Sequence, residues 1–306
     1  MKKEIELPKS IDLDDLLKNL RSLSWGAIDI LKAYSRGKEP PYGFPKALSV
    51  NDGGEGPVSA ADLSVNSWLI NGLKARFPLA SWTVISEETA KDKDQKVKCN
   101  PLEHEWSWIL DPLDGTKDFL QGTGEYAVHL ALIHGDKPVL GVVLIPELEE
   151  IWFGLVGLGT WVEDRLGNRK SFSFSNRNQI SKMILVASRS HRDQNLEQLL
   201  ESIPFSEKKR VGSVGYKIAK ILKGEADFYI SLSGKSAPKD WDMAGPEAVL
   251  TAAGGRFTHA NMKALAYNTG DLNQWGCLIA SHGKNHDLIC KMIQEKLTLI
   301  DPSFLV

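Results

Sequence analysis

The stretch WSWILDPLDGTKDF, residues 106–119, decides the fold because it joins an apolar run to two closely spaced acids. The run of two tryptophans, an isoleucine and a leucine predicts a buried strand. Asp111 closes that run, and Asp114 follows Pro112 in a turn with Gly115. Burying a carboxylate costs on the order of several kcal/mol unless something pairs with it. We therefore expect a strand end at which two carboxylates share a partner.

Two further acidic clusters fall at predicted element ends. Glu87 and Glu88 follow a short strand predicted over 82–86, and Asp242 precedes a helix predicted over about 243–253. Carboxylates at strand ends can converge on a hard cation such as Mg²⁺, which takes oxygen ligands at ~2.0–2.1 Å and keeps waters for a substrate phosphate. The clusters together favour a magnesium site.

Each cluster taken alone has a simpler interpretation. Glu87 and Glu88 fit an exposed pair, and Asp114 with Gly115 fits a plain turn. Asp242 fits a helix N-cap, because aspartate is one of the preferred residues there.

The turn between the two acids of the first stretch favours a shared ligand. The ring of Pro112 restricts this turn, so that Asp111, the carbonyl of Leu113 and Asp114 can point to one side.

Composition bounds the class of protein. The 306 residues allow one large domain or two lobes, and 42% hydrophobic with 25% charged residues is ordinary for a globular chain. A net charge of −2 does not favour a nucleic-acid groove but leaves room for a small anionic ligand. Three cysteines without a C-x-x-C pair fit a reducing compartment. The acid-rich start has no continuous apolar stretch, which argues against a secretory leader, and no apolar run approaches ~20 residues, so we expect a cytoplasmic protein without a membrane partner.

The chain divides into two predicted lobes. Helices over 11–35 and 58–76 come first, followed by strands over about 106–114, 126–133, 139–145, 151–157 and 159–164. From about residue 180, strands over 184–188, 227–231 and 276–281 alternate with helices over about 193–202, 214–223, 243–253 and 285–297. We predict an α+β lobe over 1–180 that carries most of the acids and an α/β lobe over 181–306, packed as alternating layers.

Two blocks, WILDPLDGTKDF and WDMAGPEAVLTAAGG, resemble the signature blocks of the inositol monophosphatase superfamily of Mg²⁺-dependent, lithium-sensitive phosphatases. ISEE at 85–88 and GPVSAAD at 56–62 fall in the family's order. The resemblance runs from about Asp52 to Ser281. It implies the layered αβαβα sandwich of the inositol monophosphatase and fructose-1,6-bisphosphatase type. Within the superfamily the chain is most similar to the 3′(2′),5′-bisphosphate nucleotidases, through SRSH at 188–191, GSVGYKIAKILKGEADFYI at 212–230 and KDWDMAGPEAVL at 239–250.

The resemblance implies a metal-ligand set that matches the acidic clusters. One Mg²⁺ would be held by Glu87, Asp111 and the carbonyl of Leu113, and a second by Asp111, Asp114 and Asp242. A third, weaker ion would be bordered by Glu88 and Asp52. The cofactor expected is therefore Mg²⁺, as two ions or three.

The same resemblance assigns catalytic and substrate-binding residues. Thr116 would work with Asp52 to take a proton from the attacking water, and Glu88 would support catalysis. Asp52 lies five residues before Pro57, further than the family's spacing, so Glu55 stays open as its competitor. Gly115 and Thr116 would offer backbone N–H groups to phosphate oxygens.

The second phosphate of a nucleotide would meet His191, Ser213 and Lys217, with Asp242 also touching substrate. For Lys217 a surface position on its helix is the alternative. Some relatives carry an arginine where this chain has Ser231, and Lys235 or Lys239 can take its place. We interpret His129, within a predicted strand, as a packed strand residue.

These assignments predict a Mg²⁺-dependent phosphomonoesterase for small phosphate esters, within sulfur assimilation. It would convert adenosine 3′,5′-bisphosphate (PAP) to AMP, with the phosphosulfate derivative PAPS as a second substrate. Two alternatives remain: an inositol monophosphatase or other sugar phosphatase with the same ligands, and a non-catalytic metal- or phosphate-binding relative on the same fold. The sequence leaves the oligomeric state open.

Overall fold

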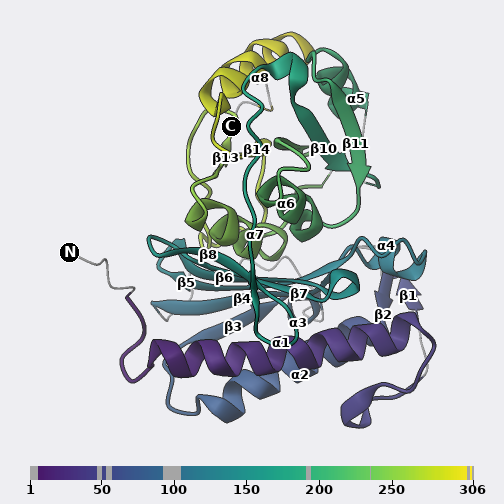
Figure 1. Cartoon of the computed structure of the whole chain (residues 1–306), viewed down its shortest axis with the longest axis vertical. Helices are drawn as coiled ribbons and strands as arrows, with labels where there is room; N and C mark the ends of the chain where they lie inside the picture. Colours follow the sequence, from purple (N-terminus) through teal and green to yellow (C-terminus); the bar gives the residue numbers. More distant parts are fainter. Residues whose placement is uncertain are drawn as a thin grey trace.

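Two long helices form an outer layer of the molecule. The computed structural model describes residues 6–46, 50–52, 57–91, 105–190, 194–234, 236–301 and 304. Helix α1 (Leu13–Ser35) begins at Asp12, whose side chain accepts the N–H of Asp15, and α2 (Ala60–Arg76) begins at Ser59. Their apolar sides pack with one face of a seven-stranded sheet, as Figure 1 shows at the bottom of the molecule.

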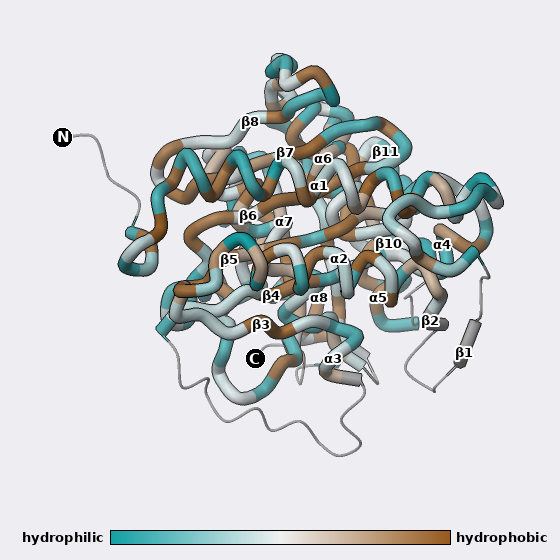
Figure 2. Tube along the Cα trace, turned by 90° about the horizontal axis from the view of Figure 1, so that it is seen from below, coloured by the Kyte–Doolittle hydropathy of each residue, from teal (hydrophilic) through white to brown (hydrophobic). Residues whose placement is uncertain are grey.

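The seven-stranded sheet is the second layer. Its strand order follows the chain, and only the β3–β4 pair is parallel. Figure 2 shows brown hydrophobic stretches along β4 and β6, as expected for strands covered on both faces. The strands are β3 (Thr83–Ser86), β4 (Trp106–Asp114), β5 (Ala127–His134), β6 (Lys137–Ile145), β7 (Glu150–Leu155), β8 (Gly159–Glu163) and β9 (Arg169–Lys170).

Two helices fill the middle layer between the sheets. Helix α6 (Val214–Leu222) and helix α7 (Asp240–Ala252) pack with the upper face of the first sheet and the lower face of the second (Figure 1). Helix α7 is buried along most of its length. Gly141 on β6 and Gly154 on β7 allow this, because a Cβ at Gly154 would lie 2.8 Å from the carbonyl oxygen of Ala248.

The second sheet and two more helices complete five layers. The sheet has the order β11–β10–β12–β14–β13, and α5 (Gln194–Glu201) and α8 (His286–Ile300) cover its outer face. The layered αβαβα expectation is therefore confirmed. The strands are β10 (Ile184–Ser188), β11 (Glu207–Val211), β12 (Phe228–Leu232), β13 (Arg256–His259) and β14 (Cys277–Ser281).

Short elements surround these layers. The strands of the first sheet end at Lys170 and those of the second begin at Ile184, and the lobe boundary at 180/181 falls between them and stays a prediction. Within the described residues, no helix has the length and apolarity needed to cross a bilayer. The remaining elements are η1 (Pro41–Gly43), β1 (Val50–Asp52), β2 (Pro57–Ser59), α3 (Glu87–Lys91), α4 (Thr116–Leu120), η2 (Pro146–Leu148) and η3 (Ile180–Lys182).

Candidate metal centre

A β-bulge at the end of β4 explains how Asp111 and Asp114, on either side of Pro112, come to lie on the same side of the strand. Asp111 pairs with His129 and Asp114 with Ala127, so β4 uses one more residue than β5 over this interval. Side chains three residues apart on a regular strand point to opposite faces, and one extra residue brings them to the same side. Pro112 is tolerated at such a position because the bulge interrupts the ladder.

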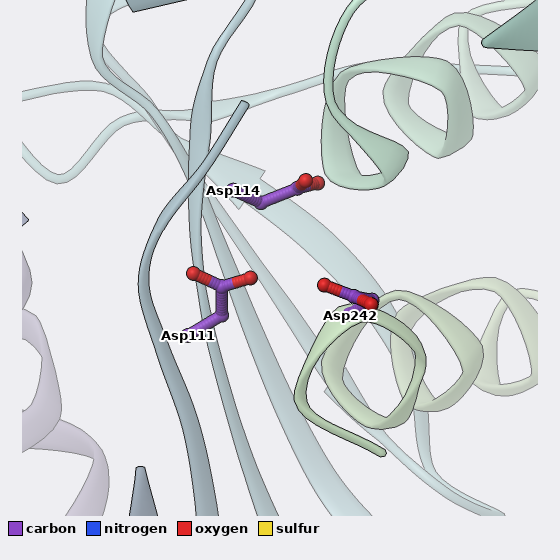
Figure 3. Close-up of side chains that lie close together, drawn as sticks. All are labelled: Asp111, Asp114 and Asp242. Carbon is purple, nitrogen blue, oxygen red and sulfur yellow. The ribbon is translucent and has the colours of Figure 1, made fainter. Parts of the chain in front are cut away.

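Asp242 completes the group from the other side of the site. Figure 3 shows the carboxylates of Asp111 and Asp114, from β4, and of Asp242, from the start of α7, turned toward one another. One oxygen of each lies within 4.8 Å of the others. Asp111 is 1% exposed, whereas Asp114 and Asp242 are partly exposed. The structure thus brings together three of the predicted metal ligands, from the two predicted lobes.

Backbone N–H groups hold each of these carboxylates. Asp111 accepts the N–H of Leu113 at 2.9 Å, and Asp242 accepts that of Lys239 at 2.6 Å. Asp114 accepts the N–H of Val214, the first residue of α6, where the helix dipole favours an anion. The carboxylates are therefore held in place by the fold.

The interpretation of Asp242 as an N-cap residue needs a correction. Helix α7 begins at Asp240 and its N-cap is Lys239, so Asp242 is the third helical residue. Its side chain still stabilises the helix start through the bond to the Lys239 N–H, and its other oxygen is free to face the cluster. Capping and metal binding are compatible at this residue.

The carboxylates of the cluster repel one another, and a bound cation would offset that repulsion. Burial, followed by the charges of Asp114 and Glu87, raises the pKa of Asp242 to about 8. Burial and the charges of Glu87, Asp114 and Asp242 raise the pKa of Asp111 well above its ordinary value. Like charges in one buried site are costly unless a counter-charge is present. An all-oxygen, anionic donor set of this kind fits a hard divalent cation such as Mg²⁺.

The other predicted metal ligands lie around this group. Glu87 begins α3 beside β4 and is outside the group of three, although its charge acts on both Asp111 and Asp242. Glu88, next along α3, is buried at 5% exposure. The carbonyl oxygen of Leu113 lies 3.1 Å from the hydroxyl oxygen of Thr116.

Thr116 contacts an acid that the sequence analysis did not single out. Its hydroxyl oxygen lies 3.1 Å from Oδ1 of Asp62, on α2. The other oxygen of Asp62 accepts the N–H and hydroxyl of Ser59 at 2.8 and 2.6 Å. Burial raises the pKa of Asp62 to about 6. The predicted partner, Asp52, has its backbone in β1, and its side chain, together with Glu55, lies outside the described residues.

Four of the predicted substrate residues lie on or at the start of α6 and in the turn after β4: Ser213, Lys217, Gly115 and Thr116. Gly115 has a φ of 88°, in the left-handed region that favours glycine, and it precedes α4. Ser213 is the N-cap of α6 and accepts the N–H of Tyr216 at 3.0 Å. His191 and Lys235 lie outside the described residues.

Lys217 is buried, and the alternative of a surface position is wrong. It is 2% exposed, its Nζ donates to the carbonyl oxygen of Gly212 and lies 5.2 Å from the centre of the Tyr229 ring. Burial lowers the pKa of Lys217 to about 8, although the charges of Asp114 and other acids oppose the shift. Lys239, the other cation considered, donates from Nζ to Asn273 at 2.7 Å.

Family comparison identifies the class of protein that this fold and acidic site define. The profile of the inositol monophosphatase family matches residues 12–298, so the chain belongs to the inositol monophosphatase family, a family of phosphatases.

Similar proteins and structures agree with this assignment. The chain is 32% identical over 215 residues to the 3′(2′),5′-bisphosphate nucleotidase CysQ of Salmonella typhimurium. The aligned region covers 70% of this chain and 80% of that enzyme. For CysQ of Escherichia coli K12 the identity is 31% over 213 residues, 69% of this chain and 79% of the relative. An inositol monophosphatase from Anabaena superposes with a TM-score of 0.69 at 23% identity, covering 95% of this chain and 98% of that one. The IMPase of Thermotoga maritima gives 0.70 at 20%, covering 94% and 98%. The two structures bear on the fold alone.

Proposed function

We propose that the protein is a Mg²⁺-dependent 3′(2′),5′-bisphosphate nucleotidase that converts adenosine 3′,5′-bisphosphate to AMP. The observation that carries the proposal is the similarity to CysQ nucleotidases over four fifths of their length, in a chain that keeps the three-aspartate group. Bound at this group, Mg²⁺ would neutralise phosphate charge and lower the pKa of a coordinated water.

The described residues of the site have separate proposed roles in metal binding and in proton transfer. Asp111, Asp114 and Asp242 would hold the cation, with Glu87 and the Leu113 carbonyl as further candidate ligands. The hydroxyl of Thr116 and the carboxylate of Asp62 lie 3.1 Å apart, so the hydroxyl can accept a proton from water while donating its own to Asp62. A phosphoryl group needs positioning and charge neutralisation more than covalent help, and these groups supply both.

Lys217 is the cation proposed for the phosphate that is not hydrolysed. It lies on α6, whose first residue bonds to Asp114, and its Nζ has a carbonyl oxygen and an aromatic ring as partners. A charge-assisted hydrogen bond to phosphate is worth about 1.5–3 kcal/mol. Ser213, the N-cap of α6, belongs to the same proposed subsite, and the family resemblance assigns His191, which lies outside the described residues, to it as well.

A phosphate-release panel tests the proposal. Adenosine 3′,5′-bisphosphate, inositol monophosphate and fructose bisphosphate are each assayed with Mg²⁺ and with EDTA. We expect release from the adenosine bisphosphate to be the fastest and to need Mg²⁺. Faster release from inositol monophosphate would establish the sugar phosphatase alternative, and no release from any ester would establish a non-catalytic relative.

Lys217→Met tests the subsite, with Lys220→Met on the same helix as its control. Methionine keeps the bulk of the buried stem, and Lys220 pairs with Glu225 at 3.0 Å. We expect Lys217→Met to lower kcat/KM for the bisphosphate by roughly ten- to a hundred-fold, and inositol monophosphate to lose much less. Equal losses on both esters would remove Lys217 from substrate recognition.

A further inference from the structure

His129 lies on β5, and both of its ring nitrogens have partners. It is fully buried. Its Nδ1 lies 3.3 Å from the carbonyl oxygen of Trp241 on α7, and its Nε2 accepts the N–H of Gly215 on α6 at 3.1 Å. A carbonyl only accepts and an amide N–H only donates, so Nδ1 carries the proton and Nε2 is bare. The expectation of a packed strand histidine is confirmed, and this neutral ring also joins the sheet to two helices.

Each of the two helices packs against the sheet beside this residue through a glycine. A Cβ on Gly215 would lie 2.8 Å from a methyl carbon of Val143 and 2.9 Å from the Cβ of Ala127, besides meeting the imidazole itself. A Cβ on Gly245, in α7, would lie 3.2 Å from the Cβ of His129. Gly215 lets α6 reach the ring, and Gly245 lets α7 pack against the Cβ of His129, so that His129 is part of the contact of each helix with β5.

Each helix carries one contact of the acidic group next to its contact with His129. Val214, whose N–H bonds to Asp114, precedes Gly215, and Trp241 precedes Asp242. Nε2 itself lies 3.4 Å from Oδ2 of Asp114. Loss of either ring contact would therefore shift a carboxylate or its anchor.

We propose that His129 is a positioning residue that sets the spacing of Asp114 and Asp242, and through it the affinity of the site for a divalent cation. This inference rests on the proposed metal-dependent function. Groups that orient metal ligands typically contribute ten- to a hundred-fold to metal affinity. A residue that only packs the core would affect stability and leave that affinity unchanged.

Calorimetric titration of the substrate-free protein with Mg²⁺ or Mn²⁺ tests the proposal. His129→Leu removes both ring contacts, and His129→Asn keeps a donor that can reach the Trp241 carbonyl. The control is His286→Leu, because His286 is as deeply buried and bonds through both nitrogens to Ser281 and Thr258, at the start of α8 in the outer layer. Thermal unfolding in EDTA records the loss of stability in each variant.

We expect His129→Leu to bind the cation about ten- to a hundred-fold more weakly and His129→Asn to recover part of the loss. His286→Leu should lose stability and bind as wild type does. Wild-type affinity in a folded His129→Leu or, where that variant fails to fold, in His129→Asn overturns the proposal. A parallel loss in His286→Leu overturns it too. Wild-type protein that binds no divalent cation refutes the proposed function and this inference together.

Discussion

Replacing Asp111 by asparagine should stabilise the metal-free protein while abolishing its activity. Its carboxylate is buried and shares the site with two others whose oxygens lie within 4.8 Å. Two unit charges at that distance repel by about 3.5 kcal/mol at an effective dielectric constant of ~20. Asparagine removes the charge, and its oxygen can still accept the N–H of Leu113.

Proton uptake limits the size of this gain. A crowded carboxyl can take up a proton instead, which costs an ordinary aspartate about 4 kcal/mol at pH 7. We therefore expect Asp111→Asn to gain about 1–4 kcal/mol in EDTA, which raises the unfolding temperature by roughly 2–6 °C. Mg²⁺ should stabilise the wild type further and the variant little, because ligand binding to the native state adds stability only where a site exists.

Thermal unfolding in EDTA and in Mg²⁺ measures both effects, with phosphate release alongside. Asp136→Asn, at an exposed position, is the control and should change neither. A variant less stable than wild type in EDTA, or one that Mg²⁺ stabilises as strongly as wild type, would refute the argument that Asp111 is held in a repulsive, cation-seeking cluster.

Three further outcomes follow from the same contacts. The pKa of Asp242 is raised to about 8 in the folded protein, whereas an aspartate in the unfolded chain loses its proton above pH ~4. Stability in EDTA should therefore fall as pH rises from 5 to 8, and a flat stability profile over that range would contradict this. Thr116→Val should lower kcat by on the order of a hundred-fold and leave cation binding unchanged, as calorimetry can check, and Asp62→Asn should match it. Gly154→Ala should cost about 1–3 kcal/mol in denaturant unfolding, because its Cβ would meet Val249 on α7, and an unchanged midpoint would count against that packing.

The sequence predicted the layers because their elements carry strong local patterns. The strands that became β4 to β7 are mostly apolar runs, and α1 has a clear apolar stripe. Strand β11, EKKRV, was missed because it is a charged edge strand whose place depends on pairing with β10. Helix α7 was predicted to begin at 243, three residues late, because Asp240 and Trp241 belong to it through tertiary contacts.

The acids of the site were predictable and their partners were not. Asp111, Asp114 and Asp242 stood at element ends, where convergence could be argued from the chain. Asp62 was hidden in GPVSAAD, which reads as a helix start; the S-x-x-D spacing shows a capping box, and only the fold brings its second oxygen to Thr116. Residues joined across layers leave no periodic signal in the sequence.

The three aspartates of the group come from both sides of the crossing between the two large sheets. Asp111 and Asp114 precede the stretch that crosses from the first sheet to the second in Figure 1, and Asp242 follows it. A chain cut in that crossing, at the exposed residues 178 and 179, would yield two fragments, each with one of the two large sheets and an incomplete set of acids. Phosphatase activity would then be restored only by fragment complementation, which makes the enzyme a reporter of whether two fused polypeptides meet.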